Sequence, residues 1–109
     1  MNTISGSADV NPYLVADRRL ATLRALDEHG GRANDSVLQI LLAAVGHDVA
    51  RDVIRADLVW MQSVGLCTVD ARSEVLHVAL ITEAGRDHVA GRSAIPGIKR
   101  ATPRPAGIA

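Results

Sequence analysis

The sequence predicts a mainly α-helical domain with one small β-hairpin. The chain has 109 residues, of which 48% are hydrophobic, and these are mostly Ala, Val, Leu and Ile, with no Phe. A chain of this length forms one domain at most, and an aliphatic composition of this kind is typical of compact helical proteins. The apolar residues are spaced three and four apart before Gly65, alternate after it, and stop alternating at Thr82. This change of period predicts helices on both sides of a hairpin.

Two helices are expected in the first half of the chain. The segment from Pro12 to His29 carries an apolar stripe at helical spacing, and Gly30-Gly31 ends it. The stripe consists of Tyr13, Ala16, Leu20, Leu23 and Leu26. A second helix begins at Asn34-Asp35-Ser36, which are good N-cap residues, and runs to Val45. Because the second helix is apolar nearly all round, we expect it to be the most buried one.

A third helix is expected from Ala50 to Val64, and it has two different faces. Ile54, Leu58 and Met61 lie at positions i, i+4 and i+7 and are expected to face the core. The opposite, exposed face carries Asp52, Arg55, Ala56, Val59 and Ser63.

A hairpin follows the third helix directly. Gly65 ends that helix, and the segments from Leu66 to Asp70 and from Glu74 to Leu80 read as two paired strands. Thr82 then caps a last helix, with Glu83 in its first turn. Three helices, a hairpin at about 66 to 81 and a fourth helix form the layout of a winged helix-turn-helix domain.

Several stretches resemble a known family. "GLCTVD" after the third helix and "LITEAGRDHVAGR" after the hairpin are similar to the strand entry and helix start of winged-helix regulators of the ArsR, MarR and PadR type. From Leu20 to about Arg100 the chain resembles a small winged-helix protein of Mu-like prophages, in which stretches similar to "NDSVLQILLAAVGHDVARDVIRADLVWMQSVGL" and "AGRSAIPGIKR" recur. The resemblance implies a winged-helix fold and a phage or prophage origin.

The resemblance also implies a DNA-binding surface. In winged-helix proteins the third helix usually enters the major groove, and the hairpin lies against phosphate or the minor groove. On this chain the residues so placed are Arg51, Asp52, Arg55, Ala56 and Val59, with Arg72 at the hairpin tip. Arginine can bond bidentately to guanine or pair with phosphate. The alternative is that Arg51 and Arg55 are solvated residues whose ion-pair partners are Asp52 and Asp57.

The ends of the chain differ in composition from the middle. Residues 1–12 are expected to be flexible, residues 13–92 to form the winged-helix domain, and residues 93–109 to be a flexible basic tail containing Pro and Gly. Lys99 and Arg100 of this tail either follow phosphate beside the bound groove or remain solvated.

Trp60 is expected to lie beside the core stripe of the third helix. It packs against the first helix or the hairpin, or it takes part in a dimer contact. Because the first and last helices offer further apolar surface, we expect a homodimer.

Composition and spacing argue against other classes of protein. The single cysteine, Cys67, excludes an intramolecular disulfide and is expected to be a small core residue. The four histidines have no metal-ligand spacing, so no metal and no other cofactor is expected. We find no nucleophile with its base and no phosphate loop, and therefore expect no enzyme. With no membrane-spanning run and no signal peptide, the expected location is the cytoplasm of a bacterial host cell.

Two functions from different classes remain open. The first is a small protein of phage origin that binds double-stranded DNA with its third helix, as a transcriptional regulator or a DNA-handling factor. The second is a protein–protein interaction module that uses the same scaffold to bind a phage protein during assembly or DNA packaging. The near-neutral third helix favours the second, whereas Arg51, Arg55, Arg72 and the basic tail favour the first.

Overall fold

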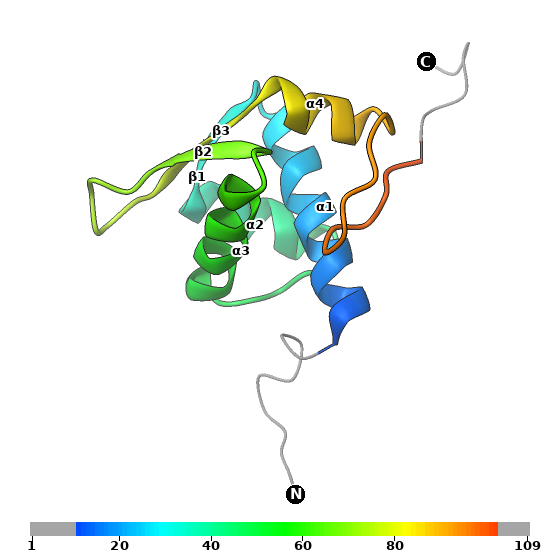
Figure 1. The fold of residues 1–109 in the computed structure, drawn as a ribbon. Coiled ribbons are helices and arrows are strands. Elements are labelled where there is room, and N and C mark those ends of the chain that lie inside the picture. Colours follow the sequence, from blue (N-terminus) through cyan, green and yellow to red (C-terminus); the bar gives the residue numbers. More distant parts are fainter. Residues whose placement is uncertain (1–10, 103–109) are drawn as a thin grey trace, which may run out of the picture.

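The computed structural model describes residues 11–102 and contains four helices and a small antiparallel sheet of three strands. The elements in chain order are α1 (Pro12–Glu28), β1 (Arg32–Asn34), α2 (Asp35–Ala44), α3 (Arg51–Ser63), β2 (Cys67–Asp70), β3 (Val78–Ile81) and α4 (Glu83–Val89) (Figure 1). The predicted hairpin between the third and the last helix is confirmed. The arrangement is mixed α/β and is compatible with a winged helix.

Side-chain caps explain where three of the helices begin. The Asn11 side chain accepts a hydrogen bond from the Tyr13 backbone N–H at 2.9 Å, and the Asn34 side chain accepts one from Val37 at the same distance. Thr82 Oγ1 accepts from the Gly85 backbone N–H at 3.0 Å. Each cap satisfies an N–H group that has no partner inside its helix. The predicted starts at Pro12, at Asn34 and after Thr82 therefore hold.

One core joins the first three helices. Its largest members are Leu20, Leu23 and Leu26 of α1, Leu38 and Leu42 of α2, and Ile54, Leu58 and Met61 of α3, each 1% exposed or less. The predicted inner faces of the first and third helices are confirmed, with one exception. Tyr13 is 85% exposed, because the first turn of α1 extends beyond the other helices (Figure 1).

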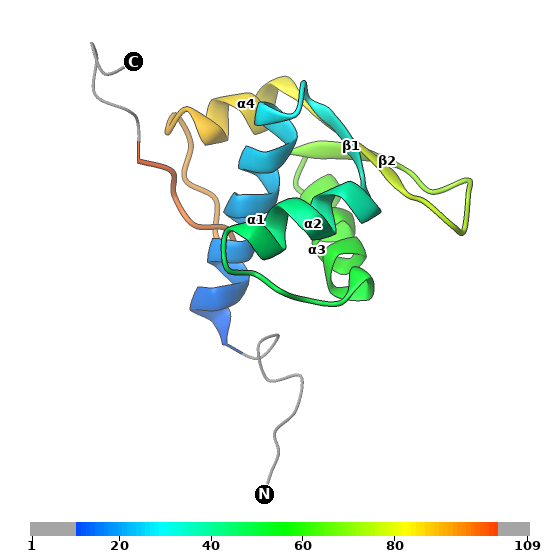
Figure 2. The same ribbon diagram turned by 180° about the vertical axis from the view of Figure 1, so that it is seen from behind.

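The second helix is not the most buried one, contrary to the prediction. Leu38 and Leu42 are fully buried, but Ile40 is 68% exposed and Val45, directly after the helix, is 65% exposed. The reason lies in the packing: α2 contacts α1 and α3, and its remaining side faces solvent (Figure 2). The apolar residues of α2 thus form a buried stripe and an exposed one.

The sheet contains one strand that the sequence analysis missed and one that it placed too early. The short strand β1 pairs with β3 through Ala33↔Ala79, and β2 pairs with the other edge of β3. The second hairpin strand was expected from Glu74 but begins at Val78. Before it, Ser73 Oγ accepts hydrogen bonds from the backbone of Val75 and Leu76, which curls the chain into a turn.

The segment after α4 belongs to the domain, which corrects the predicted boundary at residue 92. Ile98 and Ala101 are 5% and 2% exposed, and the Lys99 backbone N–H donates to the Ala16 carbonyl of α1 at 3.1 Å. The buried His88 bonds to Ser93 Oγ at 2.8 Å and to the Lys99 carbonyl at 2.9 Å. These contacts hold the segment against α1. The other parts of the segments predicted to be flexible, residues 1–10 and 103–109, lie outside the described residues.

Within residues 11–102, no helix combines the length and the apolar character that a bilayer crossing requires.

Candidate functional site

The outer face of α3 has the composition that was predicted for it. Asp52, Ala56 and Val59 are exposed, Val59 by 60% of its surface, whereas Ile54 and Leu58 point into the core. The exposed side chains are short. A partner surface can therefore approach the helix backbone closely.

Arg51 and Arg55 do not stand on this outer face; they turn toward the β2–β3 hairpin. Arg55 Nη2 donates to the carbonyls of Glu74 at 3.1 Å and Val75 at 3.0 Å, and its Nε donates to Asp35. Arg51 Nη1 donates to the Val75 carbonyl at 3.3 Å. The ion-pair partners considered in the sequence analysis, Asp52 and Asp57, are therefore wrong for both arginines. Instead, the two arginines fasten α3 to the hairpin.

Asp35 makes the Arg55 contact structurally important. Its side chain is completely buried in the first turn of α2, and its Oδ1 has no hydrogen-bond partner among the described residues. Burial is the largest single effect and disfavours the charged carboxylate, but the hydrogen bond from Arg55, a backbone hydrogen bond with His77 and the charges of Arg55 and Arg51 together outweigh it, so the pKa of Asp35 is lowered. Loss of the Arg55 side chain would leave a buried negative charge without a counter-ion.

Arg72, the DNA contact predicted at the hairpin tip, lies in the connection between β2 and β3. Its side chain is 90% exposed, and its Nη2 donates to Asp70 Oδ2 at 2.6 Å. The hydrogen bond from Arg72 lowers the pKa of Asp70 to about 2. Arg51 and Arg55 bind the carbonyls of Glu74 and Val75 in the same connection, so all three arginines belong to α3 and the hairpin attached to it.

Lys99 and Arg100 are exposed but are not brought to α3 or the hairpin. Lys99 Nζ lies 3.2 Å from Asp17 Oδ1 on α1, and its backbone is also bonded to α1. Both residues belong to the packed segment after α4, so Lys99 is not part of a mobile arm. The structure thus separates the two groups of basic residues that were expected to form one surface.

A buried charge cluster between α1 and α3 was missed by the sequence analysis. Arg18 Nε lies 2.6 Å from Asp57 Oδ2, and Arg19 Nε lies 3.2 Å from Asp57 Oδ1. The side chains of Arg18 and Asp57 are 4% and 3% exposed. No local signal could have revealed the pair, because its members are 39 positions apart. The one indication in the sequence is that Asp57, a charged residue, lies on the core side of α3 beside Leu58 and Met61.

Trp60 packs beside this cluster, in agreement with the expectation that it contacts the first helix. The Arg19 guanidinium lies 4.0 Å from the centre of the Trp60 ring, a cation–π contact. A Cβ atom added to Gly97 would come within 2.5 Å of the ring, so the segment after α4 also touches Trp60. The dimer contact considered for Trp60 stays a prediction.

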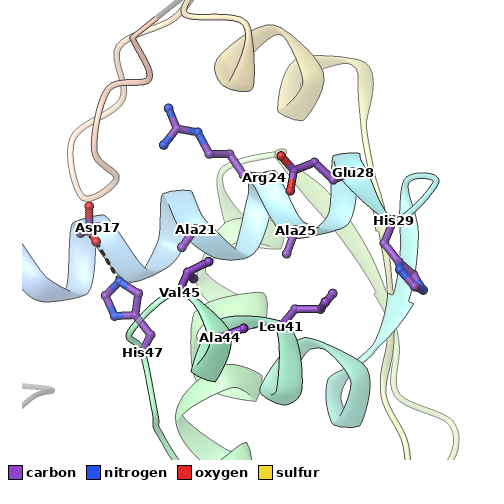
Figure 3. Close-up of a pocket in the computed structure, with 10 residues that line it drawn as sticks. All are labelled: Asp17, Ala21, Arg24, Ala25, Glu28, His29, Leu41, Ala44, Val45 and His47. Carbon is purple, nitrogen blue, oxygen red and sulfur yellow. Dashed lines mark hydrogen bonds and ion pairs between the residues drawn. The ribbon is translucent and has the colours of Figure 1, made fainter.

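A groove of about 520 Å³ lies between α1 and α2, on the side away from α3 (Figure 3). Its apolar lining consists of Ala21, Ala25, Leu41, Ala44 and Val45, and charged or polar residues, Asp17, Arg24, Glu28, His29 and His47, surround it. At one end His47 Nε2 lies 2.7 Å from Asp17 Oδ2. The hydrogen bond with His47, followed by that with Lys99, lowers the pKa of Asp17.

Cys67 is 1% exposed, as expected for a core residue. Burial raises the pKa of its thiol to about 11. The group is therefore a protonated core side chain at neutral pH and not a reactive thiolate.

Fold and site together define a small α/β domain in which a hairpin is fastened to the helix before it. No family model and no solved structure matches the chain. Protein gp26 of Escherichia phage Mu is 40% identical over 95 residues, which cover 87% of this chain and 98% of gp26. A Haemophilus influenzae protein is 39% identical over 70 residues, which cover 64% of this chain and 69% of that protein. The chain therefore belongs to the family of phage Mu gp26, and the predicted Mu-like phage origin is confirmed.

Proposed function

We propose that this protein is a winged-helix protein that binds double-stranded DNA as a homodimer and regulates transcription or handles DNA in a Mu-like phage. In this proposal α3 enters the major groove and the β2–β3 hairpin contacts the adjacent phosphates. The observation that carries the proposal is the attachment of Arg51 and Arg55 to the hairpin carbonyls. This attachment makes α3 and the hairpin one preorganised surface.

The same arginines keep hydrogen-bond donors for a nucleic acid. Among residues 11–102, Arg55 uses Nε and Nη2 but not Nη1, and Arg51 uses only Nη1. A guanidinium presents five donors in a fixed fork, and phosphate and guanine accept two of them at once. Arg72 lies in the β2–β3 connection that Arg51 and Arg55 contact, and its side chain is 90% exposed.

The charge of this surface predicts weak, salt-sensitive binding. Asp52 and Asp70 lie close to the three arginines and reduce the local positive potential. With about two to three phosphates neutralised, the logarithm of the binding constant should fall with the logarithm of salt concentration with a slope of roughly −2 to −3.

A binding titration with duplex fragments of a Mu-like phage genome, at two salt concentrations, tests the proposal. Arg72→Glu should weaken binding about tenfold on all fragments and flatten the salt slope by about one counterion. Arg92→Glu is the matched control, because Arg92 is also an exposed arginine paired with a nearby aspartate, Asp87, but it lies beyond α4. Arg51→Ala tests the helix; Arg55 is avoided because it neutralises the buried Asp35. Equal effects of Arg72→Glu and Arg92→Glu, or no salt-dependent binding by the wild type, would overturn the DNA proposal.

A protein-interaction module is the second candidate, and a different observation favours it. The outer face of α3 carries an acid and an exposed valine but no base, and the groove between α1 and α2 is lined by apolar side chains. A pull-down from phage-infected lysate, with and without nuclease, separates the two functions. A phage protein retained after nuclease treatment supports the second candidate, and a loss of all captured material supports the first.

A further inference from the structure

Exposed apolar side chains lie on the solvent-facing side of α2, beside the groove between α1 and α2. The apolar side chains on this side of α2 are Val37, Ile40, Leu41 and Ala44, and Val45 follows directly. Ile40 and Val45 are 68% and 65% exposed. Ala21 and Ala25 of α1 lie across the groove from Leu41, Ala44 and Val45 (Figure 3). Exposed apolar side chains gathered beside a groove are typical of an interaction surface, and we name these residues the α1–α2 face.

We infer that the α1–α2 face binds the same face of a second copy of this chain, with the two α1 helices antiparallel around a two-fold axis near Ala21. The inference rests on the homodimer in the proposed function and not on its DNA-binding part. A two-fold interface uses one patch on both copies, so the patch must be complementary to itself.

The charges on α1 meet this requirement. Asp17 and Arg24 are separated by two helical turns, roughly 10 Å along the axis, on the side of α1 that borders the groove. In an antiparallel pair of helices, a two-fold axis between them places Asp17 of each copy opposite Arg24 of the other. Arg24 has no ion-pair partner within residues 11–102, and the Asp17 side chain remains 43% exposed beside His47 and Lys99. Because a carboxylate can accept more than two hydrogen bonds, Arg24 of the second copy would join His47 and Lys99 at Asp17.

The side chains between these charges permit close approach of the helices. Ala21 lies between Asp17 and Arg24, and its small side chain allows two helix axes to approach to about 8 Å, the lower end of the usual range. The formal net charge of zero adds no long-range repulsion between copies. The side chains of Val45 and Leu41 would then be buried against the helices of the second copy.

The position of the face also determines where the two α3 helices lie in the dimer. Figure 1 shows α3 in front of α2, and the opposite view in Figure 2 shows α2 in front. Since the two-fold axis lies within the interface, the outer faces of α3 in the two copies point away from each other. Such a dimer presents two separate α3 surfaces instead of two adjacent ones.

Sedimentation equilibrium without nucleic acid, from low micromolar to several hundred micromolar protein, tests the interface. We expect a dimer for the wild type, and a dissociation constant raised by at least about tenfold for Val45→Glu, because each substitution occurs twice in the dimer. Val59→Glu is the matched control: it is the same exchange at a site of similar exposure, 60% against 65%, on α3. Circular dichroism of both variants checks the fold.

A pair of charge reversals tests the register. Arg24→Asp and Asp17→Arg should each weaken self-association, because like charges then face one another. An equimolar mixture of the two variants should associate again, because opposite charges meet at both contacts of the mixed dimer. At one contact Asp17 faces Arg24 as in the wild type, and at the other the introduced aspartate faces the introduced arginine. A wild type that stays monomeric, a Val45→Glu variant that dimerises normally, a Val59→Glu variant that dissociates, or a mixture that stays monomeric would each overturn the inference. The salt-dependent DNA titration is a separate measurement, so the failure of either proposal can be recognised independently.

Discussion

Replacement of Asp57 by Asn is the sharpest test of how α1 and α3 are held together. The change keeps the size of the side chain but removes the negative charge that faces two arginines. Arg18, whose side chain is 4% exposed, would then lose the carboxylate that accepts hydrogen bonds from its Nε and Nη2. Arg19 would lose one of the contacts that position it over Trp60.

The expected cost follows from the burial of the pair. Removal of one partner from a buried ion pair costs about 3–5 kcal/mol, because the remaining charge stays desolvated and has lost its attraction to that partner. The amide oxygen of Asn still accepts one hydrogen bond, with a net value of about 1 kcal/mol. We therefore expect Asp57→Asn to lower the free energy of unfolding by about 2–4 kcal/mol, and Tm by roughly 10–30 °C.

Urea unfolding followed by circular dichroism measures this change, and Trp60 fluorescence reports on the same site. Asp52→Asn is the control on the same helix, because Asp52 is exposed; its first-turn position should cost about 0.3–1 kcal/mol. The double variant Arg18→Met with Asp57→Leu should recover most of the loss, because it removes both buried charges. A cost below about 1 kcal/mol for Asp57→Asn, or one equal to that of Asp52→Asn, would refute the reasoning.

Three further predictions concern other parts of the domain. Gly85→Ala should lower the free energy of unfolding by about 1–3 kcal/mol in urea, because the new Cβ would lie 2.2 Å from the Leu66 carbonyl oxygen; an unchanged midpoint would contradict this contact. Cys67, with its buried thiol and a pKa raised to about 11, should react with a thiol reagent only after denaturation, and rapid reaction of the native protein would be contrary evidence. Because the pKa of Asp17 is lowered, its carboxylate stabilises the fold at pH values above 3.8, the ordinary pKa of an aspartate. This stabilisation is lost as the pH falls through the lowered pKa. Asp17→Asn should therefore make the acid-induced loss of stability shallower below that value, and an unchanged acid slope would argue against a role for the bond with His47.

Much of the fold could be predicted because its signals are local. Asn34 and Thr82 cap helices through hydrogen bonds to residues three positions away, and Gly65 follows α3 with a φ of +82°. The two faces of α3 follow from the spacing of its apolar residues. Such features depend on neighbours within one or two turns, and the sequence displays those neighbours directly.

The candidate site was predicted less well, because its side chains are placed by distant groups. Arg55 belongs to the exposed stripe of α3 by spacing alone, yet it turns toward Asp35 and the hairpin, 20 positions away in either direction. Arg51 bends the same way, and Lys99 is held on α1 by Asp17. Among the expected DNA contacts, the exposed positions of Asp52, Ala56 and Val59 were predicted well, because they depend only on the phase of the helix.

The sequence by itself determined where the helices begin and that a hairpin follows α3, because caps, glycines and apolar spacing act over a few residues. Only the tertiary structure decided that Arg18 meets Asp57, that three residues after Gly31 form a strand against β3, and that residues 95–101 complete the core. These features join parts of the chain that are tens of positions apart. Their stability comes from burial and from pairing of charges away from water, and these quantities exist only after the elements have packed together.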